Sequence, residues 1–443
     1  MTAPMAVDLV IEARWVVPVD APGVLDDHAL VVDAGLIVAL LPQAAVQAAY
    51  APRARVRLPT HVLMPGLVNA HTHAAMTLMR GIADDVPLQA WLEQHIWPAE
   101  ARHVSPDFVH DGSLHAAAEM LKSGITCIGD MYFYPDAAAR AYEAAGLRAL
   151  VGMPVVDFPT PYAADPDAYL SKGLAARDAF RQSSRLAFAL APHAPYTVGD
   201  ETWRKVVMYA SQLDLPIHTH VAETAGEVEA ARKATGETPL ARLDRLGVTG
   251  PSFIGVHAVH LDQADVELLA VQGCHVVHCP VSNMKLASGI APVVKLVQRD
   301  VSVALGTDGA ASNNRLDLFS EMRAASLLAK VATGDAAALP AQETVRMATL
   351  AGATALGFGA VTGSLTPGKQ ADAIAVDLAG AECHPVYDPL SHLVHVAGRE
   401  QVTDVWIGGD RVVSARQLVT IDEPAVVARA RAWRERLALR IHP

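Results

Sequence analysis

Two His-Thr-His triplets, at residues 71–73 and 218–220, carry the side chains whose type and spacing most directly indicate metal chemistry. Residues two apart on a strand point to the same side, so His71 and His73 can converge on one cation. Neutral imidazoles suit Zn²⁺ and related divalent metals. A histidine pair alone is weak evidence, because such short motifs also occur by chance in packed interiors.

Further polar residues stand at the ends of later apolar runs. His193 ends "LAFALAPH", His220 and Glu223 lie in "HTHVAET", His257 lies in "FIGVHAV", and Asp308 ends "VSVALGTD". Histidines at several strand ends, a glutamate three residues after one of them and a terminal aspartate form the inventory of a mononuclear hydrolytic site. Such a site needs ligands, an open position and a base that handles the proton of water. We therefore predict a metal-dependent hydrolase.

The elements that must position these residues are short apolar runs separated by Ala-rich, helix-permissive stretches. Alternation of this kind predicts parallel βα units, and eight units predict a closed (β/α)₈ barrel. The polar residues follow the carboxyl ends of the strands, where barrel active sites lie. The predicted strands are 66–73, 125–131, 147–154, 186–193, 215–221, 253–259, 274–280 and 301–308.

The two ends of the chain have a different pattern of apolar residues. Short Val, Leu and Ile runs broken by turn residues fill residues 7–63 and recur after residue 361. We expect a small composite β-sandwich from residues 1–64 and 361–422, a barrel over 65–360, and a C-terminal helix over 423–443. The run 29–40 predicts a hairpin that turns at Asp33-Ala34-Gly35.

Composition limits the possible partners of the protein. The formal net charge of −12 disfavours phosphate backbones and anionic membranes, so we expect neither a nucleic-acid nor a membrane partner. Four cysteines among 443 residues are too few for a disulfide scaffold. The N-terminus lacks the pattern of a signal peptide, and no apolar stretch of about 20 residues could span a bilayer. These features predict a cytoplasmic protein.

Two motifs imitate other sites. "CHVVHC" at 274–279 holds two Cys and two His, but along a strand they face opposite sides and cannot converge on a structural zinc. "GSLTPGK" at 363–369 has the spacing of a phosphate loop, but Gln370 replaces the Ser or Thr and a strand-like segment follows. We interpret it as a β turn.

The motifs "MPGLVNAHTHAAMTLMRG", "HTHVAET", "HCPVSNMKLASGIAP", "ALGTDGAASNN" and "GSLTPGKQADAIAVD" resemble those of the amidohydrolase superfamily. Within it, the chain is most similar to the 5'-methylthioadenosine/S-adenosylhomocysteine deaminases, from about residue 7 to the C-terminus. The resemblance implies hydrolytic removal of the 6-amino group of 5'-methylthioadenosine, S-adenosylhomocysteine or adenosine, with release of ammonia. It also implies a homodimer.

The same resemblance assigns roles at the metal. It implies one divalent metal, Zn²⁺ before Fe²⁺ or Mn²⁺, held by His71, His73, His220 and Asp308. Binuclear relatives use a modified lysine at the end of the fourth strand, and "APHAPY" has none. The remaining residues are expected to move the proton and to stabilise charge: Glu223 as the proton shuttle to ring N1, His257 beside the attacking oxygen, and Asp308 accepting a hydrogen bond from water.

For the substrate, the resemblance implies that Glu100 in "IWPAE" holds the ribose hydroxyls and that His193 touches the nucleoside. No arginine in 157–173 aligns with those that bind the homocysteine carboxylate in relatives. The alternative reading is an enzyme that acts on a guanine, a pterin or an s-triazine, for which a ribose-binding Glu100 has no purpose. A catalytically silent binding protein is a third reading, which the intact residue set disfavours. His218 would lie deeper in the barrel than His220, which favours packing over ligation.

Overall fold

The computed structural model describes residues 3–21 and 23–438. Its larger part is a barrel sheet in which eight strands follow one another in chain order, every paired neighbour being parallel. All eight predicted strands are confirmed. Nearly every residue of these strands is buried, as expected of a sheet covered on both faces. The strands are β5 (Leu67–Thr72), β6 (Ile125–Met131), β7 (Arg148–Val155), β8 (Leu186–Pro192), β9 (Ile217–Val221), β10 (Phe253–His257), β11 (His275–His278) and β12 (Ser302–Leu305).

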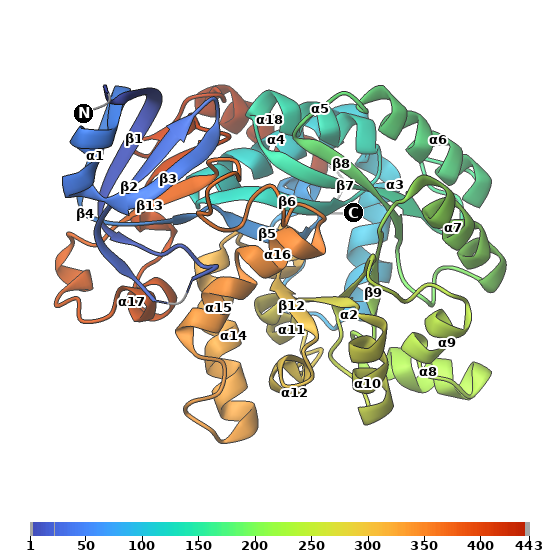
Figure 1. Ribbon diagram of the computed structural model, residues 1–443. Coiled ribbons are helices and arrows are strands. Elements are labelled where there is room, and N and C mark those ends of the chain that lie inside the picture. The colour runs from blue at the N-terminus through green and yellow to red at the C-terminus, as the bar shows by residue number, and fades with distance from the viewer. Residues whose placement is uncertain (1–2, 22, 439–443) are drawn as a thin grey trace.

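Helices cover the outside of this sheet (Figure 1). Several begin with a capping side chain followed by proline, as where Ser105 accepts from Phe108 N–H and where Asp165 accepts from Ala168 N–H. The helices between or after the barrel strands are α4 (Pro106–Lys122), α5 (Pro135–Ala145), α6 (Pro166–Ala179), α7 (Asp200–Leu213), α8 (Ala225–Thr235), α9 (Pro239–Arg245), α10 (Gln263–Gln272), α11 (Pro280–Lys285), α12 (Val293–Val297), α13 (Ala310–Asn313), α14 (Leu318–Thr333), α15 (Ala341–Met347) and α16 (Leu350–Ala355).

The first and last strands of the barrel meet at their carboxyl ends. The backbone N–H of Asp308 donates to the carbonyl of His71 at 3.0 Å, and the Thr72 hydroxyl donates to the carbonyl of Asp308 at 3.0 Å. The amide oxygen of Asn69 accepts from Thr307 N–H at 2.9 Å. These contacts bring residues that are far apart in the sequence to one edge of the sheet.

An insertion follows β5 before the first covering helix. It consists of η1 (Ala74–Met79), α2 (Leu88–Trp91), a π-helical turn η2 (Leu92–Ile96) and α3 (Trp97–His103). Trp91, Leu92 and Ile96 are buried, so the insertion packs against the barrel. This segment supplies one wall of the cavity described below.

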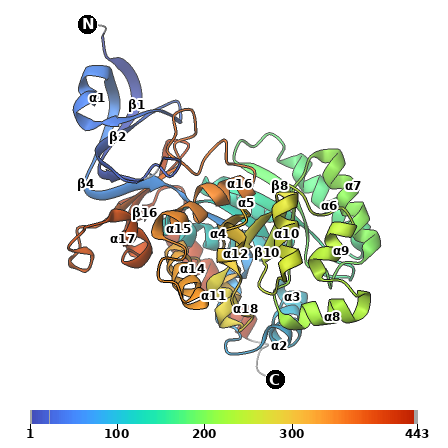
Figure 2. The same cartoon turned by 60° about the horizontal axis from the view of Figure 1, so that its bottom comes forward.

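The two chain ends form one eight-stranded mixed sheet, which confirms the predicted composite β domain. Its order is β16-β15-β14-β13-β4-β1-β2-β3, and β13 of the C-terminal flank pairs antiparallel with β4 of the N-terminal flank. Both views show this part at one end of the barrel (Figures 1 and 2). The strands are β1 (Met5–Val16), β2 (Leu25–Asp33), β3 (Leu36–Pro42), β4 (Tyr50–Pro65), β13 (Ala373–Asp377), β14 (Val402–Ile407), β15 (Asp410–Ser414) and β16 (Gln417–Leu418).

The predicted hairpin joins β2 to β3. Asp33 pairs with Leu36, so the turn residues are Ala34 and Gly35, both with positive φ (48° and 78°). This geometry suits the right-handed twist of the flanking strands. Short helices in the two flanking segments are α1 (Gln43–Ala49), η3 (Ala381–Cys383), α17 (Pro389–His395) and η4 (Arg399–Gln401), and α17 packs on α14 and α15. The domain limits predicted at residues 64 and 360 stay predictions.

The C-terminal helix α18 (Glu423–Ala438) packs on the barrel helix α4. Its Val426, Trp433 and Leu437 are buried, and the indole N–H of Trp433 donates to Asp111 at 2.9 Å. Residues 439–443 of the predicted helical segment lie outside the described residues. Across residues 3–21 and 23–438, no helix combines the length and the hydropathy that a bilayer crossing requires.

Candidate active site

Four side chains from three strands converge at the carboxyl end of the barrel. One ligand atom from each of His71, His73, His220 and Asp308 lies within 4.8 Å of the others. His71 belongs to β5 and His73 follows it, His220 belongs to β9, and Asp308 follows β12. The predicted ligands are therefore brought together by strands that are far apart in the sequence.

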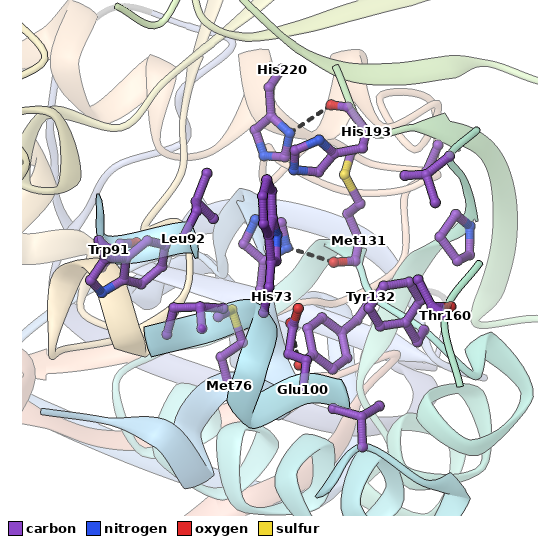
Figure 3. Close-up of a pocket in the computed structure, with 18 of the residues that line it drawn as sticks. His73, Met76, Trp91, Leu92, Glu100, Met131, Tyr132, Thr160, His193 and His220 are labelled. Carbon is purple, nitrogen blue, oxygen red and sulfur yellow. Dashed lines mark hydrogen bonds between the residues drawn. The ribbon is translucent and has the colours of Figure 1, made fainter. Parts of the chain in front are cut away.

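Hydrogen bonds fix how two of these histidines face. Nδ1 of His73 lies 2.5 Å from the carbonyl oxygen of Met131, and Nδ1 of His220 lies 2.7 Å from that of His193 (Figure 3). A carbonyl only accepts, so both Nδ1 atoms carry the proton. Their Nε2 lone pairs then point at the cluster, which is the tautomer that a metal-ligating histidine requires.

The donor set fits a divalent metal. Nε2 of His71 lies 3.2 Å from Nε2 of His220 and 3.5 Å from Oδ1 of Asp308, which is itself 3.3 Å from Nε2 of His73. Burial lowers the pKa of His71 to about 3 and that of His220 well below its usual value, so both imidazoles are neutral. Neutral imidazole nitrogens aimed at one another and at a carboxylate suit a cation such as Zn²⁺ between them.

Donors to both carboxylate oxygens hold Asp308 in place. The hydroxyls of Ser282 and Ser312 donate to Oδ2 at 2.6 and 2.7 Å, and Gly309 N–H donates to Oδ1 at 2.7 Å. Burial alone would raise the pKa of Asp308, but the neighbouring side chains of His71, His73 and His257 hold that pKa well below its usual range. Asp308 is therefore an anion whose Oδ1 remains directed at the histidines.

Glu223 lies beside this cluster on the segment that joins β9 to α8. Its carboxylate is 3.7 Å from Nε2 of His257, and burial raises its pKa. The carboxylate of Glu227 accepts from the backbone N–H groups of Ala222 and Glu223 at 2.9 and 2.8 Å. Glu227 thus fixes the backbone that carries Glu223, and a raised pKa suits a carboxyl that takes up and releases a proton near neutral pH.

A hydrogen bond to Asn283 orients the ring of His257. Its Nδ1 lies 2.8 Å from the amide oxygen of Asn283, which leaves Nε2 facing Glu223. Burial would lower the pKa of His257, but the charges of Glu223 and Asp308 and the bond to Asn283 raise it. His257 can therefore stabilise negative charge that develops near the cluster.

Three residues at these strand ends have a strained backbone. Ala222, His257 and Asp308 have φ of 52°, 72° and 60°, in the left-handed region that residues with a Cβ rarely occupy. Such conformations persist only where the surroundings enforce them, at about 1–3 kcal/mol each. The surrounding structure therefore holds these three residues in a defined backbone conformation at the carboxyl end of the barrel.

A cavity of about 270 Å³ opens onto the cluster. The insertion after β5 lines one part of the cavity with mostly apolar side chains, and a second part is polar. A small substrate with a polar reacting group needs both kinds of surface. The polar part consists of His73, His220, Glu223, His257 and Asp308.

Glu100 of α3 faces the same cavity and accepts a hydrogen bond from the Tyr132 hydroxyl at 2.7 Å (Figure 3). Burial raises the pKa of Glu100 to about 7, against the opposing effect of that hydrogen bond. A buried carboxyl with one oxygen free is suited to accept from hydroxyl groups of a ligand.

The Amidohydrolase family model matches residues 62–412. The chain belongs to the amidohydrolase family.

Proteins of similar sequence match most or all of the length of the chain. The amidohydrolase is 45% identical over 438 residues to a 5-methylthioadenosine/S-adenosylhomocysteine deaminase of Teredinibacter turnerae, with 99% of each chain covered. It is 43% identical over 381 residues to a 5'-deoxyadenosine deaminase of Methanosarcina mazei, covering 86% of this chain and 88% of the relative. A crystal structure of an adenosine deaminase from Xanthomonas campestris with bound zinc superposes with a TM-score of 0.97 at 50% identity, covering 98% of this chain and 100% of that one.

The predicted substrate contact His193 and three other side chains of this amidohydrolase have clear positions. His193 lines the cavity, its pKa is lowered to about 4 by burial, and its carbonyl is the acceptor that orients His220. Trp91 and Trp97 also line the cavity. His260 instead contacts the carbonyl of Ser288 at 2.6 Å, away from the ligand cluster.

The motifs at 274–279 and 363–369, which resemble a zinc site and a phosphate loop, contribute no residue to the metal cluster. In "CHVVHC" both Cys274 and Cys279 are buried free thiols flanking β11. The segment 363–369 forms turns and bends before β13, as predicted. His61 lies in the β domain, where its Nδ1 is 3.7 Å from Asp377.

Sequence reasoning missed the residues that support the site. Tyr132, Ser282 and Asn283 act across the barrel, and no local pattern pairs them with Glu100, Asp308 or His257. Ser312 contacts Asp308 from only four residues away. Glu227 had a signal. Thr224-Ala-Gly-Glu227 matches the capping-box pattern, and Thr224 does accept from Glu227 N–H at 3.2 Å. The glutamate side chain reaches back to the residues just before the cap.

Proposed function

We propose that this amidohydrolase is a hydrolytic deaminase that converts the 6-amino group of an adenine nucleoside to a 6-oxo group and releases ammonia. The observation that carries the proposal is one cavity that holds the His71, His73, His220 and Asp308 cluster, Glu223 beside it, and the Glu100–Tyr132 pair. A hydrolytic centre and a carboxyl suited to ribose hydroxyls thus face one ligand. The names of the relatives support the same reaction.

In this proposal His71, His73, His220 and Asp308 hold one divalent metal, Zn²⁺ above Fe²⁺ or Mn²⁺. When bound, such a metal lowers the pKa of water enough to supply hydroxide at neutral pH. The protein positions the purine so that C6 faces this centre. His193 contacts the base, and Glu100 accepts from the ribose hydroxyls.

Glu223 carries the proton. It takes the proton that water gives up and delivers it to ring N1, while oxygen adds to C6 and the ring loses aromaticity. The proton of the new C6 hydroxyl then passes to the exocyclic nitrogen, so the C–N bond breaks, ammonia leaves and the C6 carbonyl forms. His257 stabilises the negative oxygen through this sequence, and the carboxylate of Asp308 accepts a hydrogen bond from the attacking water.

The test is product analysis with the metal-loaded enzyme. Ammonia and the 6-oxo nucleoside should form in equal amounts from 5'-methylthioadenosine, 5'-deoxyadenosine or adenosine. Guanine, a pterin and an s-triazine are the comparison substrates, because none of them offers ribose hydroxyls to Glu100. Faster turnover of any of these three than of every adenine nucleoside contradicts the proposal.

We also propose that the enzyme works as a homodimer in the cytoplasm, as the resemblance to its relatives implied. Sedimentation equilibrium of the full chain tests the first part, and a molecular mass of one chain at micromolar concentration contradicts it. Fractionation of the source cells tests the second.

A further inference from the structure

The cavity wall outside the metal cluster is largely apolar. Leu88, Leu92, Ile96 and Trp97 come from the insertion after β5, and Phe133 and Phe158 come from the segments after β6 and β7. The rings of Trp97 and Phe158 pack with centroids 6.2 Å apart, and Phe158 remains 39% exposed. A substituent that extends from the nucleoside away from the reacting carbon would meet hydrocarbon here.

The lining of the cavity is poor in permanently cationic side chains. Among the described residues, its lining includes the carboxyls of Glu100, Glu223 and Asp308 but neither lysine nor arginine. A 5'-linked carboxylate at the apolar wall would meet no lysine or arginine of the lining, because His257 and the metal-holding cluster lie at the reacting end of the ligand.

Cations next to lining residues are engaged elsewhere. Lys172 donates to the carbonyl of Tyr162 at 2.5 Å and stands over that ring. Arg242 donates to Asp200 and to the carbonyl of Pro195 at 2.8 and 2.6 Å. Lys285 donates to Asp84 at 2.6 Å. Arg102 follows the lining residue Ala101 but is exposed and does not line the cavity.

We propose that this subsite selects adenine nucleosides with an uncharged, apolar 5'-substituent and rejects those with a 5'-linked carboxylate. Burial of a carboxylate without a cation is costly, whereas burial of a methylthio group on hydrocarbon is favourable. The enzyme is therefore a 5'-methylthioadenosine or 5'-deoxyadenosine deaminase that discriminates against S-adenosylhomocysteine. This inference rests on the proposed function and names its substrate class.

The test uses two synthetic substrates of matched length. 5'-Butylthioadenosine and 5'-(3-carboxypropylthio)adenosine differ only in a terminal methyl against a carboxylate. With the metal-loaded enzyme, kcat/KM for the carboxylate should be lower by about 100-fold or more. S-Adenosylhomocysteine should likewise fall below 5'-methylthioadenosine. A carboxylate substrate within threefold of its butyl partner overturns the inference and leaves the deaminase function standing. Loss of turnover with every adenine nucleoside would instead overturn the proposed function.

A pair of variants separates charge from fit. Phe158→Arg places a cation at the exposed edge of the apolar wall, and Phe158→Gln removes the same ring without adding charge. The ratio of kcat/KM for the carboxylate to that for the butyl substrate should rise about tenfold in Phe158→Arg relative to Phe158→Gln. Equal ratios in the two variants contradict the proposal, because they show that missing charge is not what limits the carboxylate.

Discussion

Nδ1 of His71 lies 3.1 Å from Nε2 of His218, so the first histidines of the two His-Thr-His triplets contact each other inside the barrel. If Nε2 of His71 faces the cluster as a lone pair, its Nδ1 carries the proton and donates to His218. The carbonyl acceptors of His73 and His220 are here replaced by an imidazole. The two triplets therefore differ in role, because the first supplies two residues to the cluster and the second supplies one together with a supporting partner.

Loss of this supporting contact should weaken metal binding. In His218→Leu, Nδ1 of His71 has no acceptor and the ring can adopt the wrong tautomer, so zinc affinity should fall by about 10–100-fold. In His218→Gln, an amide oxygen can accept in its place, and part of the affinity should return. Competition with a chromophoric chelator measures this directly. His260→Gln is the control, since His260 contacts Ser288 and lies outside the cluster. Unchanged affinity in His218→Leu contradicts a supporting role.

Replacement of Glu223 should separate chemistry from metal binding. The Glu223→Gln side chain keeps its size but cannot take up a proton, so kcat should fall by at least about 10²–10⁴-fold. Zinc content should not change, because Glu223 is not one of the four clustered ligands. Metal analysis and ammonia release on the same sample provide the measurement. Near-normal kcat with full zinc content is the result that excludes Glu223 as the proton carrier.

Glu100 should give substrate recognition a pH dependence near neutrality. Burial raises its pKa to about 7, so the carboxyl is neutral below that pH and ionised above it. Only the ionised form accepts charge-assisted hydrogen bonds from the ribose hydroxyls. The ratio of kcat/KM for 5'-methylthioadenosine to that for its 2',3'-dideoxy analogue should therefore rise about tenfold through pH 7.

Titration of the metal cluster affects kcat/KM for both substrates equally, so it does not change this ratio. In Glu100→Gln the ratio should be low and independent of pH. A pH-independent ratio in the natural chain would show that Glu100 does not hold the hydroxyls.

The junction between the barrel and the β domain should depend on one buried ion pair. Arg148, the first residue of β7, and Asp372, just before β13, are fully buried and lie 3.0 Å apart, and Asp372 also accepts from Gly408 N–H at 2.7 Å. Arg148→Met leaves that carboxylate buried without its cation, so unfolding free energy should drop by about 3–5 kcal/mol.

The matched control is Arg185→Met. Arg185 pairs with Asp410 across the same two parts of the chain, but the side chains are 29% and 75% exposed. Its loss should cost about 0–1 kcal/mol. Urea unfolding followed by fluorescence compares the two variants, and equal destabilisation contradicts the special role of the buried pair.

The barrel was predictable because its signal is local. Each buried parallel strand is a short apolar run, and the residue that ends it lies at the carboxyl edge of the barrel, where active sites occur. The sequence alone therefore placed four residues at this edge: His71, His220, His257 and Asp308. The turn at Ala34 and Gly35 was predictable for the same reason, since its residues and its strands are adjacent.

The supporting contacts were not predictable because they depend on tertiary structure. Tyr132 meets Glu100 only because α3 folds over the end of β6, and Ser282 meets Asp308 only because β11 and β12 are neighbours. The positive φ of Ala222, His257 and Asp308 was not predictable either, because Asp and His adopt it only in a minority of cases and Ala adopts it rarely. The same holds for the contact between His71 and His218, which lie 147 residues apart.

The most direct test of a one-metal nucleoside deaminase is a zinc titration of the metal-free enzyme with ammonia release from 5'-methylthioadenosine as the readout. The geometry of His71, His73, His220 and Asp308 predicts activity that rises linearly and stops at one equivalent of zinc per chain. The single variant His220→Ala should remain inactive at that stoichiometry. Activity without zinc, or a plateau at two equivalents, would contradict the central claim.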